Sequence, residues 1–163
     1  MRINEQGQAL MLELVGVLFV FLIIFLFLEN IWPENVSRWK GEYEFQTMYN
    51  RAQQESTALV ESPGYPMDWN PQSVQIVGLS VQKNVLDSNR LQMFSQMVLD
   101  DYNLTKHKMK FFEYDFFIEI DSNKDSLDRN IGRIPNPASN TAVVWRNVSL
   151  EGQNAIFRLT VFR

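Results

Sequence analysis

An uninterrupted apolar run near the start of the chain constrains its fold more than any other feature. The fifteen residues from Leu14 to Leu28 carry no charge, whereas the rest of the chain has an ordinary polar composition. Apolar side chains cover the whole helical circumference, so the run does not match a helix that packs one stripe on a soluble core. At about 1.5 Å per residue, residues 10–31 span roughly 33 Å as a helix, enough to cross a hydrocarbon core of about 30 Å. The run therefore predicts a transmembrane helix over residues 10–32.

The residues that flank the apolar run favour a retained membrane anchor over a cleaved signal peptide. Arg2 is the only basic residue before the run, and Glu5 offsets its charge. No small-x-small cleavage motif follows the run. Trp32 is typical of an aromatic anchor at the lipid headgroups, and Pro33 predicts a stop or bend in the helix. A cleaved signal and a buried core helix remain the alternatives.

Composition excludes most enzyme classes and nucleic acid as a partner. The chain has no cysteine, which removes disulfides, thiolate zinc sites and cysteine nucleophiles. A single histidine disfavours most zinc hydrolase sites and the Ser-His-Asp triad. The net charge of −4 argues against nucleic acid, because phosphates require clustered Lys and Arg. We expect a protein that is not an enzyme and has no cofactor.

Two further helices are predicted after the membrane segment. From Glu34 to Glu61 apolar side chains recur at spacings near three and four, and Asn35 can cap this amphipathic helix. Asp87–Asn89 can cap a shorter helix. The apolar side of that shorter helix comprises Leu91, Phe94, Met97 and Val98. Between the two helices, residues 62–71 contain three prolines and Trp69, which predicts an ordered turn because large aromatic side chains in loops usually pack.

The remaining patterns predict strands and an α+β fold. Alternating or strongly apolar segments lie at Ser73–Val81, Phe111–Ile120, Thr141–Leu150 and Ala155–Phe162. Asp121 to Asn140 is read as a polar loop, and Glu151 to Asn154 as the turn of a hairpin. We predict a long N-terminal hydrophobic helix that continues into the amphipathic helix, which packs on a roughly four-stranded antiparallel sheet.

Three N-x-[ST] sequons indicate export of the region after the apolar helix. Asn35, Asn103 and Asn147 begin these sequons and are the candidate glycosylation sites. The few residues before the helix are too short to fold alone. We therefore expect a cytoplasmic leader over residues 1–9, a membrane helix over 10–32 and an extracellular helix-plus-sheet domain over 33–163.

The opening GQALMLEL, followed at once by the hydrophobic helix, resembles the N-terminus of archaeal type IV pilin-like proteins. The matching positions are Gly7, Gln8 and Glu13. Further blocks that resemble this family are SPGYPMDW, SVQIVGL, YDFFIEI and the closing pair VVWRNVSLEG and FRLTVFR. The Gly-Gln-Ala-Leu opening is also similar to bacterial TadE-like pseudopilins.

The resemblance implies a structural role in a cell-surface filament or its assembly complex. It implies processing at Gly7 and Gln8 by a prepilin peptidase, and identical or homologous subunits as partners in the membrane. Glu13 would lie about one turn inside the membrane helix, where a carboxylate is costly unless it is paired. In this family the partner is thought to be the free amine of a neighbouring subunit. The alternatives are that Glu13 snorkels to the interface, and that the chain is a membrane-tethered adhesion domain that does not polymerise.

Other candidate sites carry weaker signals. Asp121, Asn123 and Asp125 are spaced like the first half of a calcium loop, but Ser126 and Gly132 occupy the positions where an EF-hand needs Gly and Glu. They are weak calcium candidates, with a solvated loop as the alternative. Aromatic residues make up 13% of the chain and could form either a sugar-binding surface or the core. The aromatic residues concerned are Trp39, Tyr43, Tyr49, Tyr65, Trp69, Phe111, Phe112, Phe116 and Phe117. His107 we expect to be solvated rather than catalytic.

Overall fold

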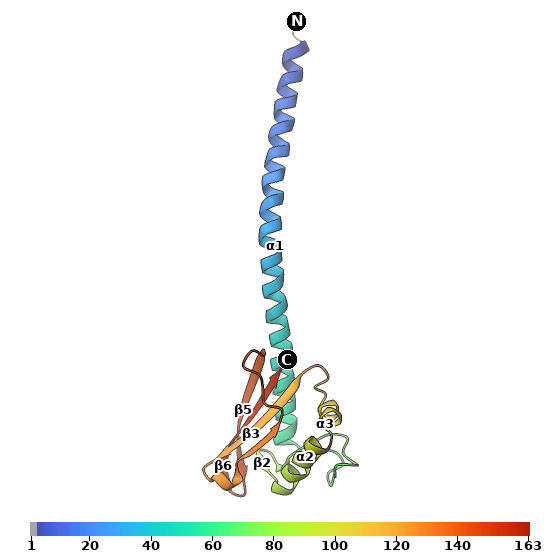
Figure 1. Ribbon diagram of the computed structural model, residues 1–163, viewed down its shortest axis with the longest axis vertical. Helices are drawn as coiled ribbons and strands as arrows, with labels where there is room; N and C mark the ends of the chain where they lie inside the picture. The colour runs from blue at the N-terminus through green and yellow to red at the C-terminus, as the bar shows by residue number, and fades with distance from the viewer. Residues whose placement is uncertain (1–2) are drawn as a thin grey trace. The chain divides into compact units, whose positions relative to one another are not determined.

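The computed structural model describes residues 3–163 (Figure 1), and the side chains of residues 3–6, 8, 30–35, 37 and 125 lie outside the described set. The fold is α+β, with an N-terminal apolar helix and a six-stranded sheet, in agreement with the predicted class. By its internal contacts the chain divides into two compact units, Met1–Tyr43 and Glu44–Arg163. The described residues of the first unit are all helical, and the second unit contains the sheet.

Helix α1 (Ile3–Glu61) is one uninterrupted helix, drawn from blue to green in Figure 1. It runs through Pro33, so the predicted stop is wrong and no new helix begins at Asn35. A proline inside a helix removes one backbone hydrogen bond, and α1 continues past Pro33 despite this loss. The hydrophobic helix therefore continues directly into the amphipathic one, and this part of the predicted fold class is confirmed.

The part of α1 in the second unit buries one stripe of side chains. Met48, Ala52, Leu59 and Val60 are almost fully buried in the core. Their spacings of four, seven and one place them on one side of the helix. Arg146, on the helix-facing side of the sheet, donates hydrogen bonds from its guanidinium to Gln53 Oε1 at 2.7 Å and Thr57 Oγ1 at 2.9 Å. Apolar burial and this polar anchor together hold the end of α1 on the sheet.

The sheet has six strands in the order β1-β2-β5-β6-β3-β4, and it is mixed rather than purely antiparallel. The strands are β1 (Ser80–Gln82), β2 (Val85–Leu86), β3 (Asp115–Ser122), β4 (Arg129–Gly132), β5 (Thr141–Leu150) and β6 (Gln153–Phe162). Strands β2 and β5 pair in parallel, and the other pairs are antiparallel. The prediction of a roughly four-stranded, purely antiparallel sheet is therefore wrong in its strand count and in the direction of one strand pair. The strands that sequence reasoning missed, β2 and β4, have two and four residues, too few for an alternating pattern to be visible.

The hairpin between β5 and β6 is tighter than predicted. Leu150 pairs with Gln153, so the turn consists of only Glu151 and Gly152. Both turn residues have positive φ angles, 51° and 77°. Two positive φ angles in a two-residue connection are the signature of a type I′ turn, whose twist matches that of the paired strands. This turn fixes the register of the two longest strands.

Helices α2 (Ser88–Asp100) and α3 (Tyr102–Lys108) lie beside the strands of this unit (Figure 1). Asp87 caps α2 by accepting hydrogen bonds from the amides of Asn89 and Arg90, as predicted. The side chains that α2 buries are the four predicted ones, Leu91, Phe94, Met97 and Val98. Asp101 caps α3 through the amide of Leu104. Helix α3 was not predicted, because it has seven residues and buries only Thr105.

The segment between α1 and β1 is the ordered turn that the sequence predicted, and it replaces most of the predicted strand Ser73–Val81. Trp69 is buried, and its indole N–H donates to the carbonyls of Pro63 at 3.0 Å and Gly78 at 3.1 Å. A Cβ on Gly78 would lie 2.2 Å from the backbone nitrogen of Gly64. The two backbone stretches therefore approach too closely for any other residue at this position.

Candidate membrane helix and outer sheet face

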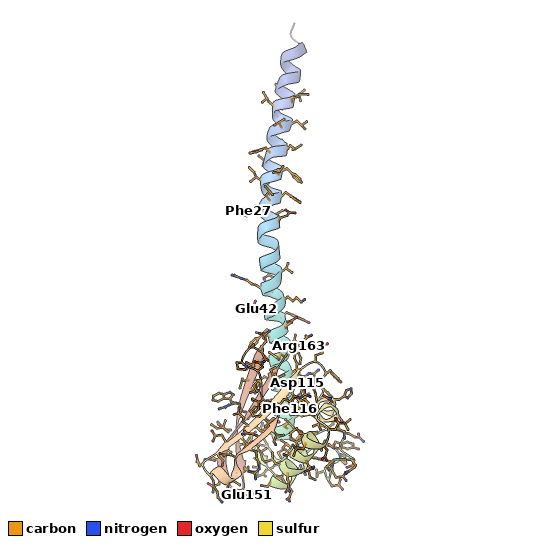
Figure 2. All side chains as sticks on the ribbon, viewed as in Figure 1. Phe27, Glu42, Asp115, Phe116, Glu151 and Arg163 are labelled. Atoms are coloured by element: carbon orange, nitrogen blue, oxygen red, sulfur yellow. The ribbon has the colours of Figure 1, made fainter. Side chains whose placement is uncertain are left out.

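Residues Ala9–Glu29 of α1 are long and apolar enough to span a membrane. None of these 21 residues is buried, and the large apolar side chains range from 47% exposed at Leu22 to 74% at Leu12. Figure 2 shows side chains projecting to both the left and the right of the helix above Phe27. An apolar surface of this extent is normally covered by lipid or by another protein. By length and composition this segment is the candidate membrane anchor.

The residues expected to act at the N-terminus lie on this same helix. Gly7 is exposed, and a Cβ there would meet nothing within 4 Å. Glu13 is exposed at the start of the apolar segment. The side chain of Gln8 lies outside the described residues. Gly7 and Glu13 are therefore both accessible on the surface of α1.

The three predicted glycosylation positions fall in different surroundings. Asn103 is exposed on α3, and Asn147 is exposed on β5. The side chain of Asn35 lies outside the described residues. Both described sequon asparagines are therefore accessible for modification, and glycan attachment stays a prediction.

The second unit has a sheet face turned away from the core, here called the outer face. It is formed by alternate residues of the three longest strands: Glu119 and Asp121 of β3, Trp145 and Asn147 of β5, and Ile156 and Arg158 of β6. The strand registers align them in two rows, Glu119–Arg158–Trp145 and Asp121–Ile156–Asn147. Side chains in one row lie close enough to interact across the strands.

The first of these rows joins a cation, an acid and an aromatic ring. The Arg158 guanidinium carbon lies 4.7 Å from the centre of the Trp145 ring, and its Nη1 lies 3.1 Å from Glu119 Oε2. Trp145 remains 60% exposed, which is unusual for the largest apolar side chain. Sequence reasoning missed this group, although the alternation of buried Val144 and Val148 along β5 indicates that Trp145 faces outward.

The calcium candidates lie at the end of β3. Asp121 and Asn123 are exposed, and the side chain of Asp125 lies outside the described residues. Asp128 accepts a hydrogen bond from the Ser122 amide at 2.8 Å, so it stabilises the loop itself. Within the described part of the chain, no group of three or more His, Cys, Asp or Glu side chains could hold a metal ion. Calcium binding stays a prediction.

A polar cluster centred on Asp115 connects α3 to β3. Its carboxylate lies 2.8 Å from Lys106 Nζ and 3.4 Å from Arg133 Nη1, and it accepts a hydrogen bond from Tyr102 Oη at 3.2 Å. Burial alone would raise the pKa of Asp115, but the hydrogen bond and charge of Lys106 and the charge of Arg133 outweigh it and lower this pKa. Burial raises the pKa of Tyr102 to about 12. The cluster joins α3 to β3 through Lys106, Tyr102 and Asp115.

The aromatic residues considered for sugar binding are divided between core and surface. Trp69, Phe111 and Phe116 are buried, so they serve the core and cannot contact a ligand. Phe112 is exposed, and its ring packs edge to face with that of His107 at a centroid distance of 4.8 Å. His107 is exposed, as expected.

Comparison of the chain with protein-family models, with curated proteins and with solved structures gives no match. The exposed apolar helix and the outer face are the two features from which a function can be argued.

Proposed function

We propose that the chain is a pilin-like structural subunit of an archaeal cell-surface filament or of its assembly complex. In this proposal Ala9–Glu29 inserts into the membrane and later bundles with the same helix of neighbouring subunits, while residues 33–163 stay outside the cell. The observation that carries the proposal is that no residue of the apolar segment is buried within its own chain. Surface that is apolar on every side can be covered equally well by lipid and by identical helices.

Glu13 gives this assembly a chemical control. A carboxylate near the end of a membrane helix is costly unless it is neutralised or paired. Removal of the leader at Gly7 and Gln8 by a prepilin peptidase would create a free amine, and the amine of one subunit would neutralise Glu13 of the next. The pairing is possible only between processed subunits, so cleavage would license assembly.

The test is to replace Glu13 by Gln in the full chain in its native cells. We expect loss of high-molecular-weight, detergent-resistant assemblies, with membrane insertion unchanged because Gln is neutral. The matched control is Glu42→Gln, an exposed glutamate of α1 outside the apolar segment. Normal assembly of the Glu13→Gln variant would contradict the proposed neutralisation.

The alternative proposal is a single-pass, membrane-tethered extracellular binding or adhesion domain that does not polymerise. The exposed Trp145 on the outer face favours a binding role for the sheet domain. N-terminal sequencing of native material separates the two proposals. A cleaved N-terminus in large assemblies supports the filament subunit, whereas an intact Met1 in a chain extracted as a single subunit supports the tethered domain.

A further inference from the structure

The second row of the outer face borders a hollow of about 480 Å³. This volume lies within the range of about 300–1,000 Å³ that is typical of small-molecule sites. The described lining includes three asparagines, Asn123, Asn147 and Asn154, together with Asp121 and Ile156. We call it the asparagine hollow.

Ser122, which also lines the asparagine hollow, bonds the backbone of Lys124, whereas four other polar side chains of the lining are not used by the fold. Asp121, Asn123, Asn147 and Asn154 are all exposed, and none of their side chains has a hydrogen-bond partner among the described residues. Each amide offers two donors and an acceptor, and the carboxylate offers two acceptors. The hollow therefore presents several free groups of both kinds.

An apolar floor and a second hollow complete the site. Ile156 lies between Asp121 and Asn147 in the strand register, so an apolar surface separates the polar groups. A smaller hollow of about 190 Å³ shares Asp121 and Ile156 with the first and extends to Arg158. Arg158 packs on the exposed ring of Trp145 in the same row. The outer face can thus receive a ligand longer than one ring.

The chemistry of the hollow selects among ligand classes. The described lining of the asparagine hollow contains no Lys or Arg, which disfavours phosphates and other anions. It is too polar for a lipid chain, because unpaired amides would be desolvated at a cost. Neutral saccharides carry neighbouring hydroxyls, which donate and accept like the amides, and apolar ring faces, which fit Ile156.

We propose that the outer face binds a neutral saccharide, with one sugar ring in the asparagine hollow and the chain directed along the second hollow toward Arg158. Asp121 accepts from a pair of hydroxyls, Asn147 and Asn154 donate and accept, and Ile156 contacts the ring face. The site does not depend on filament assembly. The sugar can be a free or foreign saccharide, or the glycan attached to the Asn147 sequon.

The test uses the full chain, made without glycosylation and held in a zwitterionic detergent, because maltoside and glucoside detergents carry sugar. Ligand-observed NMR measures the binding of neutral trisaccharides of glucose, mannose, galactose and N-acetylglucosamine. We expect Asp121→Ala and Asn154→Ala each to weaken binding about tenfold, the loss that corresponds to one or two hydrogen bonds. The control is Asn103→Ala, an exposed asparagine on α3 that is not part of the hollow. Circular dichroism verifies that each variant is folded.

Protein from the native cells identifies the source of the sugar. If Asn147 carries a glycan by mass spectrometry and the native chain no longer binds the trisaccharide, the attached glycan occupies the hollow. If the native chain still binds, the ligand is a separate saccharide. The proposal is overturned if no trisaccharide binds the unmodified chain up to about 10 mM, beyond the weak end of specific recognition, or if Asn103→Ala weakens binding as much as Asp121→Ala.

Discussion

Two stretches of helix α1 have the same backbone and opposite surroundings. In Ala9–Glu29 apolar side chains point in every direction and all are exposed, so that Leu18 is 61% exposed. In the stretch after Glu44 they form a single stripe, and Leu59 is 1% exposed. The difference shows that the arrangement of apolar residues around a helix, rather than the helix itself, decides which environment it needs.

The energetic consequence differs in the same way. Full burial of a leucine stabilises a fold by about 1.5–3 kcal/mol, and Leu59 contributes this to the sheet unit. The surface of Leu18 contributes nothing to the fold of the chain that contains it. Its apolar surface is stabilised only when lipid or another helix covers it.

Replacing one leucine of each stretch by alanine is the strongest test of this contrast. We expect Leu59→Ala to lower the free energy of unfolding of the sheet unit by about 2–5 kcal/mol, because it opens a cavity in the core. Leu18→Ala is expected to leave that free energy unchanged. Urea unfolding of the full chain in micelles, followed by near-ultraviolet circular dichroism, measures both. Equal losses in the two variants would break the contrast.

A charge placed in each stretch tests the membrane side of the comparison. Phe19→Arg lies near the middle of the apolar segment, where insertion of an arginine costs about 2.5–3.5 kcal/mol. We expect this variant to be released from membranes by alkaline carbonate extraction. Phe45→Arg, in the second unit, is expected to remain membrane-bound like the unaltered chain. Retention of the Phe19 variant would argue against a membrane span.

The polar anchor of the buried stretch has an intermediate expected effect. Arg146→Met removes the hydrogen bonds to Gln53 and Thr57 and leaves their oxygens without that donor. We expect a loss of about 1–3 kcal/mol in the urea measurement. The control is Arg163→Met, because the exposed pair of Arg163 with Glu113 contributes about 0–1 kcal/mol. If the two arginines cost the same, Arg146 is not an anchor of α1.

The smallest expected effect concerns the stability of the sheet unit in acid, which depends on Asp115. Because the pKa of Asp115 is lowered in the folded state, its carboxylate stabilises the fold above the unfolded pKa of about 3.9. This contribution is lost as the pH falls through the lower folded pKa. We expect Asp115→Asn to cost about 1 kcal/mol at pH 7 and to flatten the loss of stability below about pH 4. Asp68→Asn, at an exposed position, serves as the control for both measurements.

The elements with strong local patterns could be predicted from the sequence. The bounds of β5 and the four buried residues of α2 match the prediction, because alternation and helical spacing extend over ten and thirteen residues. The turn at Trp69 was also recognisable, since a large aromatic residue among prolines needs a packing partner. Long patterns thus fixed the core of the sheet unit.

The remaining elements depend on tertiary contacts that leave little trace in the sequence. Strand β4 lies in a segment read as a polar loop, and it forms because the partner β3 offers a free edge. The predicted strand from Ser73 is replaced by a turn, because Gly64 and Gly78 bring two backbone stretches together. The outer face was missed for a similar reason: the neighbours of Trp145 come from β3 and β6, which only the strand register reveals.

The lengths of the strands carry a last consequence. Strand β5 has ten residues, but only Ser149 and Leu150 pair with the two-residue strand β2, so residues 141–148 have no strand partner on that side among the described residues. An edge of this length offers free main-chain groups to which another strand could add. Strand β5 therefore leaves the sheet unit open to main-chain pairing along this edge.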